Sequence, residues 1–283
     1  MPETGGGNKP FIRATVDLLD ETFDVSQIGN CLLFLQITTG SVSFCIFHTG
    51  SGKYVGLRHY LFARENDLYS CCRSVFESDE LLRLKYKNCC GLWLSPRYGL
   101  VPVPLFDPQA VEKYINFTLG KATDETTLYR CMQEAQTYVV FSVPAELKNI
   151  VEAYQPATQW FHQSETFIRF VPEEKQAAFF FYGNNMDITV RQSQKLLFYN
   201  TFAVKTSEDV LYFLASVLNL HGLPLSVDIA FAGVWDESPY KSISQYVTHI
   251  SEWTPDHVGT AGNFTESLLR RFFHLFYLSR CAS

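Results

Sequence analysis

The sequence has few charged residues and no excess of basic ones. Only 18% of its 283 residues are charged, and 29 acidic side chains outnumber 23 basic ones, so the formal net charge is -6. Such a chain has no overall positive field for phosphate groups, which argues against nucleic acid or an anionic membrane surface as its main partner. Apolar residues make up 47% of the chain and include 24 Phe. This composition predicts a folded protein with a large core.

Long apolar runs are also missing. The longest ones, at residues 31–35, 177–182 and 272–278, fall well short of the roughly 20 residues that a membrane span needs. Residues 1–14 contain neither the apolar region nor the cleavage site of a signal peptide. We therefore expect residues 1–28 to form a flexible lead-in and the protein to be cytoplasmic, with no membrane span.

The eight cysteines do not follow a metal-binding spacing. Cys31 and Cys45 lie in apolar, strand-like runs, where a thiol behaves as a small apolar side chain. The doublets Cys71-Cys72 and Cys89-Cys90 are separated by sixteen residues, but neither has the C-x-x-C spacing of a zinc ribbon. Adjacent side chains point in different directions, so four thiolates cannot easily converge on one ion. We predict packing cysteines and no metal, with a redox role of the doublets as the alternative.

One pattern of secondary structure occurs twice along the chain. Three β-rich runs separated by Gly-containing turns precede a helical segment at residues 64–76. The same order returns in three further runs, followed by a helix that begins with the capping box Thr206…Asp209 and ends at Gly222. The six runs are residues 31–37, 42–48, 54–62, 177–182, 186–192 and 195–204.

Each half then offers a strand, a loop and a second helix. Asp107-Pro108 and Ser238-Pro239 both read as helix starts, because Pro at the first helical position loses no hydrogen bond. The first half continues with a strand at 138–143 and a helix at 144–154, and a break follows at 171–176.

The pattern predicts an α/β protein made of two duplicated β-β-β-α-β-α halves that face a central cleft. The first half is expected at residues 29–173 and the second at 174–283. The second half ends in a helix at 265–280 that is too apolar to be exposed on all sides.

This order of elements is that of the actin, Hsp70 and sugar-kinase superfold, whose halves carry ribonuclease H-like subdomains around a nucleotide cleft. That parallel is an analogy of topology. Three segments, SFCIF at 43–47, LVPVPLFD at 100–107 and KLLFYNTF at 195–202, resemble the hallmark segments of an uncharacterised bacterial family, domain-of-unknown-function family 3822. The resemblance implies an actin-like ATPase fold and supplies no substrate.

The acids that nucleotide chemistry requires in this superfold are not at their expected places. Thr38 occupies the first hairpin position where a carboxylate would face Mg²⁺, and Tyr182 occupies the equivalent position of the second hairpin. Asp187 lies beyond that turn, and Gly233 is followed closely by Trp235, which predicts a filled region.

A degenerate nucleotide site is therefore expected, with no catalytic residue, no cofactor and no metal. The residues of this vestigial cleft would be Thr39, Gly40, Ser41, Gly183, Asn184, Asn185 and Gly233. Plain turn chemistry accounts for Gly40, Gly183 and Asn184 equally well, because Gly and Asn tolerate positive φ.

No other catalytic arrangement is visible. The seven His are scattered, and the sequence contains no H-E-x-x-H, G-x-S-x-G, G-x-G-x-x-G or P-loop motif. His249, Asp256 and His257 fit surface residues better than a proton relay. We expect His162 to be a capping or half-buried imidazole.

The leading hypothesis is a non-catalytic actin-like scaffold that binds an unidentified protein partner or a second copy of itself. The apolar positions Leu268, Phe272, Phe273 and Phe276, or Tyr199 and Phe202, are either interface or core. The alternative is a divergent nucleotide-binding switch or kinase-like protein, in which Ser41, Asn184, Asn185 or Asp187 replaces the usual acids.

Overall fold

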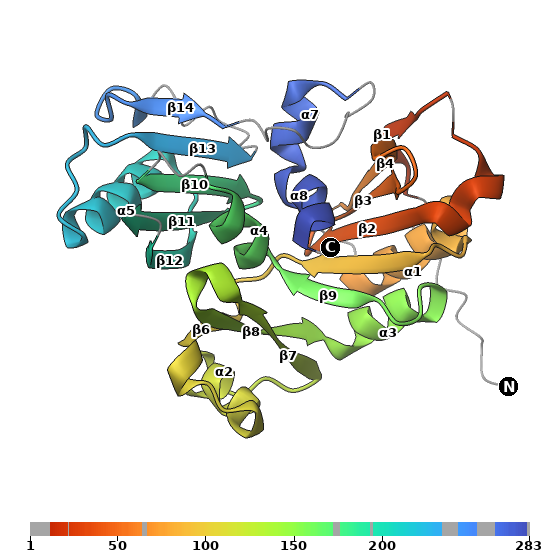
Figure 1. The fold of residues 1–283 in the computed structure, drawn as a ribbon, viewed down its shortest axis with the longest axis horizontal. Helices are drawn as coiled ribbons and strands as arrows, with labels where there is room; N and C mark the ends of the chain where they lie inside the picture. The colour runs from red at the N-terminus through yellow and green to blue at the C-terminus, as the bar shows by residue number, and fades with distance from the viewer. Residues whose placement is uncertain are drawn as a thin grey trace, which may run out of the picture.

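The structure is a computed structural model that contains three β-sheets with helices between and around them (Figure 1). It describes residues 12–21, 23–63, 67–171, 176–192, 195–233, 243–253 and 264–281. The α/β class predicted from the sequence is confirmed.

The first sheet has six strands in the order β1-β4-β3-β2-β5-β9. Its strands are β1 (Ala14–Leu19), β2 (Cys31–Thr38), β3 (Ser41–His48), β4 (Lys53–Leu61), β5 (Asn88–Trp93) and β9 (Gln159–His162). Strands β2, β3 and β4 form an antiparallel meander, whereas β5 and β9 run parallel to β2. Residues 14–19 were expected in a flexible lead-in, and that expectation is wrong, because β1 pairs with β4 at the edge of the sheet. A short 3₁₀ helix, η1 (Val25–Asn30), then leads into β2.

The second sheet repeats the arrangement of the first. Its order is β12-β11-β10-β13-β14, with an antiparallel meander from β10 to β12 and two strands parallel to β10. The strands are β10 (Ala177–Tyr182), β11 (Asn185–Gln192), β12 (Lys195–Ala203), β13 (Ile229–Gly233) and β14 (Ile250–Glu252). Apart from the additional edge strand β1, the two sheets thus share strand order and strand direction.

Two of the predicted helices follow the meanders. Helix α1 (Leu68–Ser78) begins after the N-cap Asp67, later than the expected start, whose residues 64–66 lie outside the described part. Helix α5 (Ser207–Leu220) has the predicted capping box, in which the Thr206 hydroxyl accepts from the Asp209 N–H and the Asp209 carboxylate accepts from the Thr206 N–H. The helix start predicted at Ser238-Pro239 lies outside the described residues.

The third sheet is an insertion between β5 and β9 that the sequence analysis did not separate from the first half. It is antiparallel, in the order β6-β8-β7. Its elements are β6 (Tyr98–Pro102), η3 (Val103–Leu105), η4 (Pro108–Ala110), α2 (Val111–Leu119), β7 (Glu125–Met132), η5 (Gln133–Ala135) and β8 (Thr137–Pro144).

This insertion corrects the pairing of the two predicted second helices. Asp107 does cap a helical turn, because its carboxylate accepts from the Gln109 N–H, but the α2 that follows packs on the third sheet. Helix α3 (Ala145–Tyr154) instead leads into β9 and packs beside α1, so α3 is the crossover between the parallel strands β5 and β9.

The C-terminal segment forms two helices, α7 (Glu266–Arg271) and α8 (Phe273–Cys281), that meet at Phe272. Helix α8 packs against β2, β3 and β5, although the sequence analysis assigned it to the second half. The Tyr54 hydroxyl of β4 lies 2.5 Å from the Phe276 carbonyl and 2.6 Å from the Ser279 hydroxyl. The end of the chain therefore belongs to the core of the first sheet.

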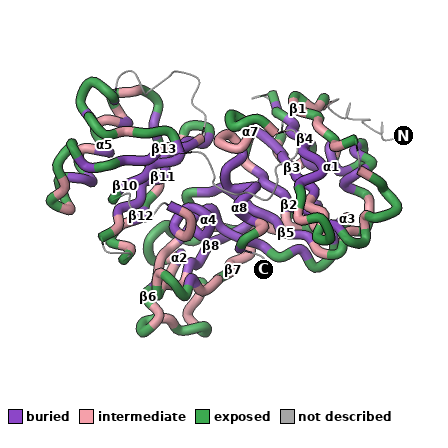
Figure 2. The backbone as a smooth tube through the Cα atoms, turned by 45° about the horizontal axis from the view of Figure 1, so that its top comes forward, coloured by how far each residue is buried: buried purple, intermediate pink, exposed green. Residues whose placement is uncertain are grey.

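Helices α8 and α4 (Gln163–Phe170) lie between the two large sheets and contact each other (Figure 1). Buried residues run along both helices and the central strands (Figure 2). Phe272, Phe273 and Phe276 are core side chains, as is Tyr199, so the core interpretation of these positions is correct. Among the helices that the structure describes, none is long and apolar enough to cross a bilayer.

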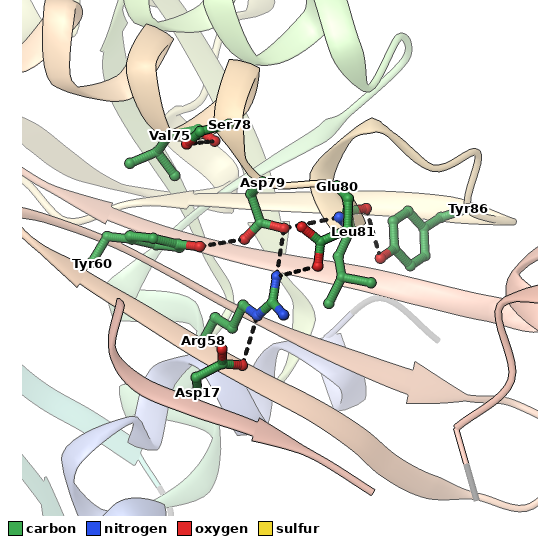
Figure 3. Close-up of polar contacts among 9 residues, drawn as sticks. All are labelled: Asp17, Arg58, Tyr60, Val75, Ser78, Asp79, Glu80, Leu81 and Tyr86. Atoms are coloured by element: carbon green, nitrogen blue, oxygen red, sulfur yellow. Dashed lines mark hydrogen bonds and ion pairs between the residues drawn. The ribbon is translucent and has the colours of Figure 1, made fainter. Parts of the chain in front are cut away.

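A buried cation ties the edge of the first sheet to the end of α1 (Figure 3). Arg58 on β4 donates from Nε to Asp17 at 2.7 Å and from Nη1 to Asp79 at 2.8 Å and Glu80 at 3.0 Å. The Tyr60 hydroxyl donates to the second Asp79 oxygen at 2.6 Å. Burial opposes the charge of Arg58, but the hydrogen bond to Asp17 and the nearby charge of Asp79 raise its pKa above the usual value.

We predict that Arg58→Met lowers the free energy of unfolding by about 3–5 kcal/mol, because it leaves the buried Asp79 carboxylate without its cation. Arg73→Met, which removes an exposed ion pair with Glu146, should cost less than about 1 kcal/mol. Urea denaturation of both variants measures the difference. Equal losses would show that the buried ion pairs of Arg58 stabilise the fold no more than the exposed pair of Arg73 does.

Candidate functional site

The carboxyl ends of the parallel strands in the two large sheets point toward the middle of the molecule (Figure 1). In α/β proteins this is the edge where ligands bind, because loops and helix starts gather there. Ser95 follows β5, His162 ends β9, Gln163 begins α4 and Tyr182 ends β10. These four residues contact one another, so the strand ends meet in one place.

Gln163 joins the two sheets at this point. Its side-chain amide nitrogen lies 2.9 Å from the Ser95 carbonyl and 2.9 Å from the Tyr182 hydroxyl. The Ser95 N–H donates to the side-chain oxygen of Gln163 at 3.3 Å. Gln163 is fully buried, so these bonds satisfy an amide that has no access to water.

Asp187 is the acid of this junction, and it has no exposed surface. Three hydroxyls donate to its carboxylate: Thr201 at 2.6 Å, Tyr199 at 2.7 Å and Tyr182 at 3.3 Å. Thr201 stands directly opposite Asp187 in the pairing of β11 with β12. Burial raises the pKa of Asp187 to about 7, although the three hydrogen bonds act in the opposite direction.

His162 attaches the third sheet to the same junction. Its Nδ1 accepts from the Ser164 N–H at 3.2 Å, which caps α4, and its Nε2 lies 3.1 Å from the Ser95 carbonyl. The Tyr98 ring of β6 packs on the imidazole with centroids 4.5 Å apart. Burial lowers the pKa of His162 to about 3, so the ring is neutral at physiological pH. The capping role is confirmed, but the ring is fully buried and not half-buried.

An ion pair strengthens the attachment of the insertion. Glu165 completes the capping box of α4 by accepting from the His162 N–H at 3.0 Å. Its other oxygen accepts from Arg130 of β7 at 2.8 Å. Burial raises the pKa of Glu165, and the charge of Arg130 opposes that shift. We name Ser95, Tyr98, His162, Gln163, Tyr182, Asp187, Tyr199 and Thr201 the junction cluster.

The first predicted hairpin is closed by its own hydroxyls. Thr39 and Gly40 form the two-residue turn between β2 and β3. The Thr38 hydroxyl accepts from the Gly40 N–H at 3.1 Å and lies 2.8 Å from the Ser41 hydroxyl. Gly40 does not have positive φ, so the turn does not require glycine there, contrary to the turn argument made from the sequence. A Cβ at Gly40 would meet no atom within 4 Å.

The second hairpin and the end of β13 do depend on glycine. Gly183 has φ +54° in the first turn position between Tyr182 and Asn185, where a type II′ turn requires positive φ. The Asn184 carbonyl accepts from the Val204 N–H at 2.8 Å, and Asn184 itself does not have positive φ. At Gly233, with φ +96°, a Cβ would lie 2.2 Å from the Phe181 carbonyl oxygen, so only glycine fits.

The predicted vestigial residues thus lie at two hairpin turns and one strand end. Within the described residues, no hydrogen bond joins the first hairpin to the second or to Gly233. Trp235 lies outside the described residues. Sequence reasoning singled out Tyr182 and Asp187 but missed their partners. The missed signal is that Tyr199 and Thr201 alternate on one face of β12.

The cysteine doublets pack in the core. Cys71 and Cys72 on α1 and Cys89 and Cys90 on β5 belong to one buried cluster, as the packing interpretation predicts. All eight cysteines are free thiols. Across the described part of the chain, no group of three or more His, Cys, Asp or Glu side chains is placed to hold a metal ion.

Comparison with known proteins agrees with this architecture. The model of the family "Protein of unknown function (DUF3822)" matches residues 20–250. The chain belongs to this family. No curated protein matches the sequence.

Solved structures show the fold. A Bacteroides thetaiotaomicron protein with an actin-like ATPase fold and unknown function has a TM-score of 0.75 at 16% identity, over 82% of this chain and 94% of that one. The PilM-PilN type IV pilus biogenesis complex gives 0.57 at 10% identity, over 88% and 96%. The cytoplasmic domain of EpsL, from the type II secretion system of Vibrio cholerae, gives 0.52 at 9% identity, over 89% and 95%. The DUF3822 chain therefore has an actin-like ATPase fold.

Asp187 gives a prediction for stability against pH. Because its folded pKa of about 7 exceeds the ordinary 3.8, its stabilising effect is complete below pH 4 and is lost as the pH rises to 7. Between pH 4 and pH 8 the free energy of unfolding of the wild type should therefore fall by about 4 kcal/mol more than that of Asp187→Asn, because asparagine does not titrate.

Urea denaturation across this range tests the prediction. Asp209→Asn is the matched control, because hydrogen bonds to the Lys205 and Thr206 backbone lower the pKa of Asp209 and its effect has the opposite sign. A constant difference between wild type and Asp187→Asn would mean that the carboxyl group does not titrate in this range.

Proposed function

We propose that this protein is a non-catalytic actin-like scaffold that acts by binding another protein or a second copy of itself. The observation that carries the proposal is the junction cluster. At the edge where the fold would hold a ligand, Tyr182 is buried and hydrogen-bonded to Gln163 and Asp187. Asp187 is fully buried, and both of its carboxylate oxygens accept hydrogen bonds from protein hydroxyls. Neither oxygen is therefore open to a metal ion.

Two structural neighbours add support, since their names place them in assemblies. PilM is described in a complex with PilN, and EpsL as a component of a secretion system. A role in an assembly requires binding surfaces and no turnover. The eight free thiols, seven of them buried, further support a cytoplasmic location for our protein.

Affinity co-purification of the full chain from its native cell, combined with analytical ultracentrifugation of the pure protein, tests the scaffold. We expect one stoichiometric partner or a concentration-dependent oligomer at micromolar concentration. A monomer that retains no protein would overturn the proposal.

A second candidate function, binding of a nucleotide or another phosphate compound, rests on one observation beside the first hairpin. Gln36, Ser43 and His59 stand opposite one another on β2, β3 and β4. The Gln36 side-chain oxygen and His59 Nε2 are buried without a hydrogen-bond partner, while His59 Nδ1 lies 2.8 Å from the Ser43 hydroxyl. Burial, with the charge of Arg271, lowers the pKa of His59 to about 4, so the ring is neutral. A small polar ligand would satisfy both atoms.

Thermal melting with Mg-ATP, Mg-GTP and ADP separates the two functions. A ligand at 100 times its Kd stabilises the fold by about 2.7 kcal/mol and raises the melting temperature by several degrees. For a scaffold we expect no change. Gly40→Val is a clean probe because its side chain meets open space, and Gly99→Val is its matched control. A rise in melting temperature that Gly40→Val abolishes and Gly99→Val preserves would establish the second function.

A further inference from the structure

A groove lies on the outer face of the first half. It lies between α1 and α3, at the turn that precedes β7, and has a volume of about 480 Å³. A groove of this size accommodates several side chains of a peptide. The inserted third sheet contributes Asp124, in the turn before β7, to its lining. It is separate from the junction cluster.

The groove has an apolar floor and an acidic rim. Ile150 is buried in the floor, and the Tyr154 ring packs on Phe76 with centroids 5.5 Å apart, so the floor is fixed by the core. Ala153 is exposed on the same helix and adds no bulk. The floor therefore offers a firm apolar surface for one or two side chains.

The rim carries the exposed carboxylates of Glu77, Asp124 and Glu146. Of the described residues that line the groove, Arg73 alone is basic, and it is paired with Glu146. The groove thus has an excess of negative charge. A cation of a bound segment would be attracted to it.

The backbone holds Asp124 firmly in place. Its φ is +65°, in the left-handed region that non-glycine residues adopt only uncommonly. Its carbonyl accepts from the Ala145 N–H at 2.8 Å, so the turn before β7 is bonded to the first residue of α3. The backbone that carries the Asp124 carboxylate is therefore tied to α3 before any partner arrives, which reduces the entropy cost of ordering this turn on binding.

We propose that this groove binds a short segment of a partner protein in which Lys or Arg lies next to an apolar side chain. The apolar side chain packs on Ile150, Ala153 and Tyr154, and the cation lies against the acidic rim formed by Glu77, Asp124 and Glu146. The inference rests on the proposed scaffold function and names the chemistry of its partner. A twofold contact with a second copy is disfavoured, because it would set acidic rim against acidic rim.

A peptide titration of the full chain tests the chemistry of the groove. The probes are fluorescein-labelled octapeptides of alternating Lys and Leu, or of alternating Glu and Leu, measured by fluorescence anisotropy. We expect the Lys-Leu peptide to bind at least tenfold more tightly than the Glu-Leu peptide. Glu77→Gln/Asp124→Asn, which removes two charges, and Ala153→Trp, which fills the floor, should each weaken the Lys-Leu peptide at least tenfold.

Matched controls separate the groove from the general acidity of the surface. Glu112→Gln removes an exposed charge on α2, and Ser216→Trp adds an indole to an exposed position of α5. Both should leave the affinity for the Lys-Leu peptide unchanged, and melting curves verify that every variant is folded. Absence of binding, or equal weakening by the controls, would overturn the groove proposal.

Co-purification with the same variants distinguishes this proposal from the scaffold function. A partner that is retained by Ser216→Trp and lost from Ala153→Trp supports both. A partner that both variants retain overturns the groove and leaves the scaffold standing. If the wild-type chain retains no protein and does not self-associate, the scaffold fails whatever the peptides do. Self-association that Ala153→Trp abolishes would assign the groove to a second copy and overturn the partner segment.

Discussion

The architecture depends on the burial of one carboxylate. Asp187 has no contact with water, so hydroxyls from neighbouring strands must stabilise it, and Tyr182 and Tyr199 can reach it only when β10, β11 and β12 are in register. The Tyr182 hydroxyl in turn accepts a hydrogen bond from the Gln163 side-chain amide, which also donates to the Ser95 carbonyl. A chain of hydrogen bonds thus runs from the second sheet through α4 to the end of β5. The two large sheets are thus held together by side chains at the carboxyl ends of their parallel strands.

The same chain of contacts explains how an inserted sheet becomes part of the body of the protein. Tyr98 packs on His162, and Arg130 pairs with Glu165, so both ends of the capping turn of α4 contact the insertion. The same insertion contacts α3 through the Asp124 carbonyl, which accepts from the Ala145 N–H. The insertion therefore connects the junction cluster to the groove, which Asp124 lines.

Local features of the fold were predictable from the sequence, because their causes are local. The meanders, the capping box of α5, the cap at Asp107 and the capping role of His162 follow from residues within a few positions of one another. The edge strand β1, the third sheet and the position of α8 were missed. Each depends on contacts between residues far apart in the chain, such as Tyr54 with Phe276. For the same reason the sequence pointed to Tyr182 and Asp187 but not to Gln163.

The return of α8 to the first sheet has a consequence for how the chain is made. Helix α8 packs on β2 and β3 but follows them far along the chain, as in the contact of Cys45 with Leu275, which are 230 residues apart. On the ribosome the first sheet must therefore wait with an apolar face uncovered until α8 has emerged. A product that terminates before α8 would display that face to the quality-control machinery of the cell.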